Sequence, residues 1–339
     1  MTILVTGGLG YIGSHTVVEL LQNNFEVVII DDLSNTEKFI LKNIEEITGK
    51  KPIFYPFDLK RKELLKQVFD AHKIEGCIHF AAYKAVGESQ VKPIDYYENN
   101  LFSLINLLQE MKERNISNFI FSSSCTVYGQ ADTMPIDENT PLKLPESSYG
   151  KTKQMGEEIL KDFATAHQKK ITLLRYFNPI GAHPSAKLGE LPIGIPNNLI
   201  PFVMQTAAGI REKLSIWGDD YPTVDGTAVR DYIYVVDLAK AHVKALQKLI
   251  NSSEEKVIDI YNLGTGKGSS VLEVVHAFEK ANNVKVPYEI KDRRAGDITI
   301  AYANADKAEK ELGWKSETSL EEALRTVWQW QKYLETRDN

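Results

Sequence analysis

The chain has 339 residues, of which 43% are hydrophobic and 25% charged, as is ordinary for a globular protein with a large core. Its net charge of −6 comes without a basic block, which argues against a nucleic-acid partner. We see neither a run of 18 apolar residues nor a signal peptide, so we expect no membrane span. Only two cysteines occur, Cys77 and Cys125. Cys77 lies inside a predicted strand, so a structural disulfide is not expected and a reducing cytoplasm fits.

Strand-like and helix-like runs alternate through the first half of the chain. Amphipathic helical segments, such as 11–24 and 62–72, separate continuous apolar runs of the kind found in parallel strands covered on both faces. This order predicts an α/β fold of the Rossmann type, a doubly wound parallel sheet with helices on both sides. The predicted strands are 3–6, 26–30, 52–57, 76–81, 118–124 and 171–177.

The texture of the sequence changes after about residue 178. Residues 179–200 carry several Pro and Gly residues and predict an ordered loop. We therefore predict a Rossmann domain over 1–178 and a smaller, mainly substrate-binding domain over 179–339, some of whose segments return to the same sheet. The shorter elements expected in this second part are 214–218, 231–250, 257–264, 304–312 and 318–335.

A glycine-rich turn, TGGLGYIGSH at 6–15, follows the first predicted strand and opens the first helix. Its G-x-G-x-x-G spacing lets the backbone approach a pyrophosphate at a helix N-terminus. The second strand ends in Asp31-Asp32, where a carboxylate can bind both ribose hydroxyls and repel a 2′-phosphate. The pattern predicts NAD rather than NADP as cofactor, although Asp32 could equally be a solvated turn residue.

Tyr149 and Lys153 are four residues apart in SSYGKTK, a spacing that places both on one face of a helix. The free pKa of tyrosine is ~10, so tyrosine is a poor base at neutral pH. A fixed ammonium one turn away, together with a bound nicotinamide cation, could lower that pKa by ~3 units, which requires ~4 kcal/mol. An isolated Y-x-x-x-K pair is common by chance. Combined with the glycine turn, it predicts a nicotinamide enzyme with a tyrosine base.

Further segments carry a resemblance to a known family. With SSSCTVYG at 122–129, LRYFNPIGAHPS at 174–185 and RRAGDI at 293–298, the chain resembles the UDP-glucose (UDP-galactose) 4-epimerases, which are extended short-chain dehydrogenase/reductases. The resemblance runs from residue 2 to about 335. It implies an isomerase of galactose metabolism that interconverts UDP-glucose and UDP-galactose through a transient 4-keto sugar. Tightly bound NAD would be regenerated in each turnover.

The resemblance also implies roles for individual residues. Tyr149 would take the proton of the sugar 4′-hydroxyl, Lys153 would bind the nicotinamide ribose, and Ser124 would bind the 4′-oxygen, although a serine there is otherwise most often a turn former. The implied NAD contacts are Gly7, Gly10, Tyr11, Ile12, Gly13, Asp31, Asp32, Asn35, Asp58, Leu59, Phe80, Ala81, Lys84, Asn99, Tyr149, Lys153 and Phe177. The implied UDP-sugar contacts are Ser124, Asn178, Asn198, Trp217, Arg230, Arg294, Asp297 and Ala301.

Three of these substrate contacts bear on specificity. Arginine suits a nucleotide sugar because its planar guanidinium pairs with pyrophosphate oxygens through two hydrogen bonds. Arg230 could instead belong to a surface ion pair, and Trp217 could be a core residue. Ala301 aligns with the gate residue of the family's sugar pocket, where a bulky aromatic excludes N-acetylated sugars. The small side chain therefore predicts activity on UDP-GlcNAc and UDP-GalNAc as well.

Other functions are weighed against this one. A nucleotide-sugar 4,6-dehydratase or decarboxylase of the same superfamily is a rival, but dehydratases carry an Asp-Glu pair for water elimination where this chain has Thr126-Val127. A non-catalytic NAD-binding regulator commonly loses the tyrosine or the lysine, and both are present. The segment GTGKGSS at 264–270 lacks the Walker A spacing and predicts a turn before a helix. The histidines lack metal-ligand spacing, so no metal is expected. The resemblance also implies a homodimer, which is the usual state of the family.

Overall fold

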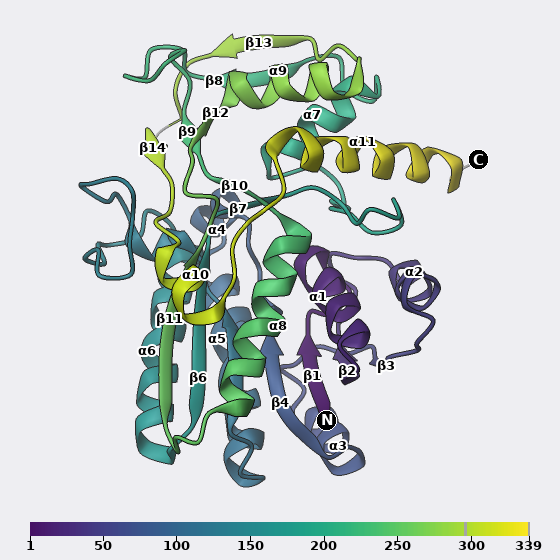
Figure 1. Ribbon diagram of the computed structural model, residues 1–339, viewed down its shortest axis with the longest axis vertical. Helices are drawn as coiled ribbons and strands as arrows, with labels where there is room; N and C mark the ends of the chain where they lie inside the picture. The colour runs from purple at the N-terminus through teal and green to yellow at the C-terminus, as the bar shows by residue number, and fades with distance from the viewer. Residues whose placement is uncertain (295–296, 338–339) are drawn as a thin grey trace.

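A computed structural model describes residues 1–294 and 297–337 of the chain. In this part, seven strands form one sheet in the order β11-β6-β5-β4-β1-β2-β3 (Figure 1), and every neighbouring pair is parallel. The predicted Rossmann-type sheet is therefore confirmed. Its strands are β1 (Thr2–Thr6), β2 (Glu26–Ile30), β3 (Ile53–Tyr55), β4 (Ile74–His79), β5 (Asn118–Ser122), β6 (Lys170–Tyr176) and β11 (Val257–Leu263).

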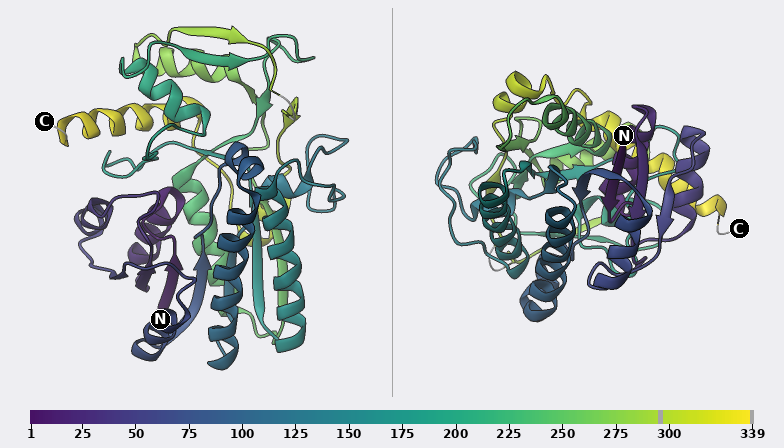
Figure 2. Two further views of the ribbon diagram at one scale, coloured as in Figure 1. Left: turned by 180° about the vertical axis from the view of Figure 1, so that it is seen from behind. Right: turned by 90° about the horizontal axis from the view of Figure 1, so that it is seen from below.

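Helices cover both faces of this sheet. On one face α1 packs against α8, and on the other α5 packs against α6 (Figures 1 and 2). Successive side chains of a strand point to opposite faces, so Ile3 and Val5 enter the core beneath α1 whereas Leu4 enters the core beneath α5. The helices of the Rossmann part are α1 (Tyr11–Gln22), α2 (Phe39–Thr48), α3 (Lys62–Ala71), α4 (Val86–Val91), α5 (Pro93–Glu113), η1 (Cys125–Tyr128), α6 (Ser148–His167) and α8 (Val235–Asn251).

The rest of the second half forms a smaller lobe beside the carboxyl ends of the strands (Figure 1). Its strands make three small sheets, β10-β7, β12-β9-β14 and β13-β8, whereas β11 returns to the main sheet. The boundary near residue 178 stays a prediction. The remaining elements are β7 (Asn178–Ile180), α7 (Leu199–Ala207), β8 (Leu214–Trp217), β9 (Val229–Arg230), β10 (Tyr232–Tyr234), β12 (Ser269–Ser270), α9 (Val271–Asn282), β13 (Tyr288–Lys291), β14 (Ile300–Ala301), α10 (Asp306–Leu312) and α11 (Leu320–Arg337).

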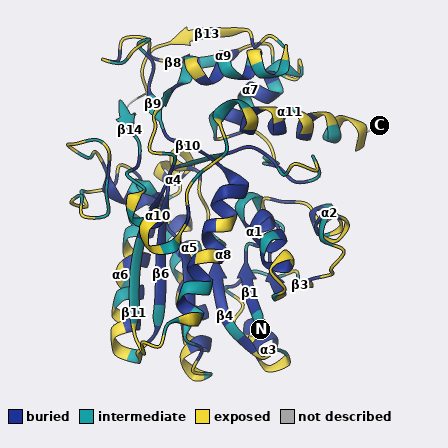
Figure 3. Cartoon of the chain, in the orientation of Figure 1, coloured by how far each residue is buried: buried dark blue, intermediate teal, exposed yellow. Residues whose placement is uncertain are grey.

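The strand order places a crevice where the chain changes direction across the sheet. β1 lies between β2 and β4, and ligands of such sheets bind at the carboxyl ends of the strands at this switch point. The strands are mostly buried (Figure 3), so what reaches the crevice is the set of loops that follow them. These are the glycine turn after β1, the segment 80–84 after β4 and Ser123-Ser124 after β5.

The structure can be compared with the sequence predictions for the 264–270 segment, the cysteines, membrane helices and metal ligands. The expected turn before a helix is found at 264–268, where Gly266 has a φ of 74°; the short strand β12 follows, and Ser270 with Glu273 forms a capping box that opens α9. Cys77 is buried in β4, and both cysteines are free thiols. Among residues 1–294 and 297–337, no helix is long and apolar enough to cross a bilayer. The same residues contain no cluster of His, Cys, Asp and Glu that could hold a metal ion.

Candidate active site

A cavity of about 320 Å³ lies at the carboxyl edge of the main sheet. Every predicted NAD contact lines it, from the glycine turn through Asp31 and Lys84 to Phe177. Three predicted substrate contacts line it too: Ser124, Asn178 and Asn198. The cavity thus brings together residues from the ends of six neighbouring strands, β1 to β6, and from the loop that precedes α7.

The glycine turn forms a cradle that side chains would fill. A Cβ added to Gly7, whose φ is +68°, would lie 2.8 Å from the backbone nitrogen of Ala81. A Cβ added to Gly13 would lie 2.1 Å from the carbonyl oxygen of Gly7. Gly10 is the N-cap of α1, so the N-terminus of that helix opens at the cavity. Backbone and dipole together suit a pyrophosphate, and these residues therefore fit the dinucleotide that the sequence predicts.

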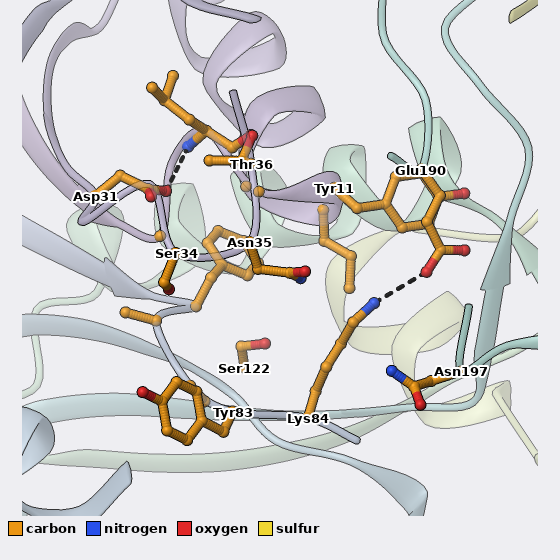
Figure 4. A pocket seen from close by; sticks show the side chains of 18 of the residues that line it. Tyr11, Asp31, Ser34, Asn35, Thr36, Tyr83, Lys84, Ser122, Glu190 and Asn197 are labelled. Carbon is orange, nitrogen blue, oxygen red and sulfur yellow. Dashed lines mark hydrogen bonds and ion pairs between the residues drawn. The ribbon is translucent and has the colours of Figure 1, made fainter. Parts of the chain in front are cut away.

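Asp31, at the end of β2, holds the turn in place (Figure 4). Its two carboxylate oxygens accept hydrogen bonds from the backbone nitrogens of Leu9 and Leu33, both at 3.0 Å. Each carboxylate oxygen has two lone pairs, so acceptor capacity remains for a ribose. Asp32 accepts from the backbone nitrogen of Ser34 at 2.9 Å and also lines the cavity. It therefore shapes the turn and remains available to a ligand.

Tyr149 and Lys153 project from the first turns of α6 towards the same cavity. The N-cap Ser147 accepts a hydrogen bond from the backbone nitrogen of Gly150, which fixes where this helix begins. Tyr149 is 8% exposed and Lys153 is 4% exposed. The Lys153 Nζ donates to the carbonyl oxygen of Ser122 at 2.7 Å and lies 5.8 Å from the centroid of the Tyr149 ring. The predicted common helix face is thus observed.

Burial shifts the pKa values of both Tyr149 and Lys153. It raises the pKa of the Tyr149 hydroxyl well above its ordinary value; the charge of Tyr176 acts in the same direction, and a hydrogen bond with Ser124 opposes it. Burial also lowers the pKa of Lys153 to about 7, which the charge of Glu157 partly opposes. Among the protein's own groups, the exclusion of water from the phenolate therefore dominates the pKa of Tyr149. The expected lowering of that pKa depends on a bound nicotinamide cation as well as on Lys153, and it stays a prediction.

The sequence reasoning missed Glu190, which connects the two sides of the cavity (Figure 4). Its Oε1 accepts from the Lys84 Nζ at 3.0 Å and from the Asn198 Nδ2 at 2.6 Å. Its backbone oxygen accepts from the indole nitrogen of Trp330 at 3.0 Å. Glu190 lies in the loop rich in Pro and Gly, where no periodic pattern marks a functional residue. Tyr176, also missed, bonds to the Ser122 hydroxyl at the end of an ordinary apolar strand.

The other predicted substrate contacts gather on neighbouring elements of the smaller lobe. The Arg294 guanidinium lies 5.1 Å from the ring centroid of Trp217, and Arg230 pairs with Asp297 at 3.3 Å. Ala301 lies opposite Arg230 in the pairing of β14 with β9. Trp217 is 38% exposed, so it is not a core residue. Ala295 and Gly296, within the RRAGDI segment, lie outside the described residues.

Comparisons with known proteins agree with this geometry. The family model described as GDP-mannose 4,6 dehydratase matches residues 4–327. A UDP-glucose 4-epimerase of Bacillus subtilis is 53% identical over 332 residues, which cover 98% of this chain and 97% of that protein. In the segment after β5, this chain carries Thr126-Val127 in place of the Asp-Glu pair expected of dehydratases.

Solved structures resemble the whole chain. The UDP-glucose 4-epimerase of Bifidobacterium longum in complex with NAD⁺ and UDP has a TM-score of 0.94 at 48% identity, with 98% of each chain covered. The enzyme of Stenotrophomonas maltophila, with bound NAD and formylated UDP-arabinopyranose, has a TM-score of 0.95 at 45% identity, with 99% of each chain covered. This chain belongs to the UDP-glucose 4-epimerase family of extended short-chain dehydrogenase/reductases.

Proposed function

We propose that this chain catalyses the reversible, NAD-dependent 4-epimerisation of UDP-glucose and UDP-galactose through a transient 4-keto sugar. One observation carries the proposal: Tyr149, Lys153 and Ser124 meet at a cavity whose other end is a glycine cradle for a dinucleotide. When bound, NAD supplies the acceptor and the donor of the C4 hydride. Homologous structures contain NAD together with UDP or a UDP-sugar analogue, which supports the same pair of ligands here.

The side chains divide the remaining work. Tyr149 takes the proton of the 4′-hydroxyl and returns it to the same oxygen after the keto sugar has turned over in the site. Ser124, which already interacts with the Tyr149 hydroxyl, donates a hydrogen bond to the 4′-oxygen. Lys153, buried against Tyr149, supplies the positive charge that favours the tyrosinate.

On the substrate side, we propose that Arg230 and Arg294 bind the pyrophosphate of the UDP-sugar. Their contacts with Asp297 and Trp217 hold both guanidinium groups at one edge of the smaller lobe, and the partly exposed Trp217 would pack against the uracil. Asn178 and Asn198 line the same cavity as Tyr149 and would orient the sugar.

Proton NMR of the purified protein with UDP-galactose and without added NAD tests the proposal. We expect UDP-glucose to form until a fixed equilibrium ratio is reached, because the cofactor is retained. Tyr149→Phe should abolish turnover while NAD remains bound. No conversion, even with added NAD, would favour another nucleotide sugar or a non-catalytic NAD-binding role.

Ala301 sets the sugar range in this proposal. Ala301 is 7% exposed and is paired with Arg230 across β14 and β9, so a larger side chain there would enter space beside this arginine. We propose that UDP-GlcNAc and UDP-GalNAc are also interconverted. Ala301→Tyr should abolish the N-acetyl activity alone, and an unchanged ratio of the two activities would overturn this idea.

We further propose a cytoplasmic homodimer. Two free thiols suit a reducing compartment. The outer face of α5 exposes large apolar side chains, with Ile94 71% and Phe102 54% exposed, and a second copy of the chain would bury them. Light scattering should give the mass of a dimer for the native chain, and Phe102→Glu should shift it towards a monomer; a monomeric native chain would contradict the proposal.

A further inference from the structure

A buried ion pair lies directly behind the tyrosine and lysine. Glu157 is one helical turn beyond Lys153 on α6 and is fully buried, and Arg175 on β6 is 2% exposed. The Arg175 Nε lies 2.9 Å from the Glu157 Oε1, and the Nη2 lies 2.6 Å from the Oε2. Burial disfavours the guanidinium charge, but the hydrogen bonds and charge of Glu157 outweigh it and raise the pKa of Arg175. The contacts with Glu157 thus favour the charged form of Arg175 in the protein interior.

This pair is connected to the end of β5, where the catalytic serine lies. The Ser123 Oγ donates to the Glu157 Oε1 at 2.6 Å. The neighbouring Ser122 offers its carbonyl oxygen to the Lys153 Nζ, and Ser124 follows at once. The Glu157 carboxylate thus anchors the end of β5. This strand end carries the Ser122 carbonyl that Lys153 contacts and the Ser124 hydroxyl that interacts with Tyr149. The position of the carboxylate depends on α6 and β6 together.

The network continues away from the cavity without an unsatisfied group. The Arg175 Nη1 donates to the Tyr128 hydroxyl at 3.0 Å, and that hydroxyl donates to the Asn262 Oδ1 at 2.7 Å. A buried ion pair adds little to stability compared with well-packed apolar residues. A fully satisfied network of this kind fixes one arrangement of the elements that carry it.

The charges around Lys153 give Glu157 a second effect. Lys153 is packed between α6, β4 and β5, and the titratable groups facing it are Tyr149 and Glu157 on α6 and His79 on β4. Burial lowers the pKa of His79 to about 3, and Lys153 acts in the same direction, so His79 is neutral. Glu157 is then the anion that favours the ammonium form of a lysine whose own burial disfavours it.

We propose that Glu157 is a positioning residue for the epimerisation. Held by Arg175, its carboxylate fixes the end of β5 through Ser123 and adds a negative charge that favours the ammonium form of Lys153, so that Lys153 can assist Tyr149. The kinetic part of this inference rests on the proposed function, whereas the effect on Lys153 does not. Arg175 has the supporting task of holding the carboxylate in place.

The double variant of Glu157 and Arg175 and the variant Ser123→Ala separate the electrostatic role of Glu157 from its role in anchoring β5. Glu157→Gln leaves Arg175 buried without its counter-charge, which is strongly destabilising and can prevent folding. The double variant Glu157→Met with Arg175→Met removes both charges and leaves an apolar pair of similar size, which folds in comparable cases. Ser123→Ala breaks only the connection to β5. Glu158→Gln is the matched control, because this neighbouring glutamate pairs with Lys161 on the exposed side of α6.

The titration of Lys153 is measured first, by NMR of lysine labelled with ¹³C at Cε, with the signal assigned by its loss in Lys153→Met. In the double variant we expect the midpoint to fall by about one pH unit or more, as removal of a nearby buried charge requires. Glu158→Gln should leave it unchanged. A midpoint that does not move in the double variant would overturn the electrostatic part of the proposal, whatever the chemical activity proves to be.

The pH profile of kcat tests the link to the reaction. In the double variant the loss of activity at alkaline pH should begin about one pH unit lower, since Lys153 loses its proton earlier. Ser123→Ala should lower kcat about tenfold without moving that limb, because it loosens the strand end but keeps the charge. An equal loss of kcat at all pH values in both variants would mean that Glu157 has only a structural role. If the native enzyme shows no turnover while the Lys153 midpoint still shifts, the proposed function fails and the electrostatic inference stands.

Discussion

Acid should destabilise this protein steeply, because three of its histidines are buried without charge. His15, His79 and His242 are at most 2% exposed. Burial lowers the pKa of His15 and of His79 to about 3 and that of His242 to about 4, with smaller contributions from His183 for the first and Lys153 for the second. Among the described residues, the Nε2 atoms of His15 and His242 have no hydrogen-bond partner, so a proton there would be an unpaired buried charge.

The sign follows from proton linkage. The folded-state pKa lies below the unfolded value of about 6.5, so the unfolded chain binds more protons between about pH 6.5 and pH 4. Stability is therefore fully present above about pH 6.5 and is lost as the pH falls through this window. Each histidine contributes a loss of about 2 kcal/mol between pH 7 and pH 5, or about 6 kcal/mol for the three together. That loss is comparable to the whole stability of many proteins.

Urea unfolding at pH 5, 6 and 7 measures this dependence, and His242→Phe isolates one histidine. Phenylalanine keeps a ring against Phe80, whose centroid lies 4.8 Å from that of His242, and removes the titrating group. The variant should lose about 2 kcal/mol less than the native chain between pH 7 and pH 5. His276→Gln, at an exposed position on α9, is the control and should lose as much as the native chain. Equal losses in His242→Phe and the native chain would refute the reasoning.

Two further predictions concern the cavity. Gly13→Ala places a Cβ 2.1 Å from the backbone oxygen of Gly7, so NAD retained through purification, measured by absorbance after denaturation, should fall by about tenfold or more. Gly87→Ala, where a Cβ meets nothing within 4 Å, should retain it, and equal retention in both variants would contradict the cradle. Glu190→Gln weakens charge-assisted hydrogen bonds on both sides of the cavity, so KM for UDP-galactose should rise about fivefold with less change in kcat. Glu46→Gln, in an exposed ion pair, should leave KM unchanged. An equal rise of KM in this control would contradict a specific role of Glu190 in substrate binding.

The local sequence pattern predicted the architecture well because parallel strands covered on both faces are continuous apolar runs. Continuous apolar runs alternating with amphipathic segments gave all six strands expected in the first half, with β3 shorter than its apolar run at 52–57. The run at 231–250 is the instructive exception: it divides into β10 and α8 at Val235. Apolar periodicity continues through that boundary, and only the packing of the α8 face on the sheet decides where the helix begins.

The sequence by itself determined the cradle, the Tyr149–Lys153 face and the carboxylate at the end of β2, because each depends on spacing within one element or one turn. Only the tertiary structure decided the rest. Glu190 reaches Lys84 from a loop 106 residues further along the chain, and Glu157 meets Arg175 across a helix and a strand. Ionisation is decided at the same level: burial raises the pKa of Tyr149 and lowers that of Lys153, since the energy of a charge depends on the water that the surrounding fold excludes.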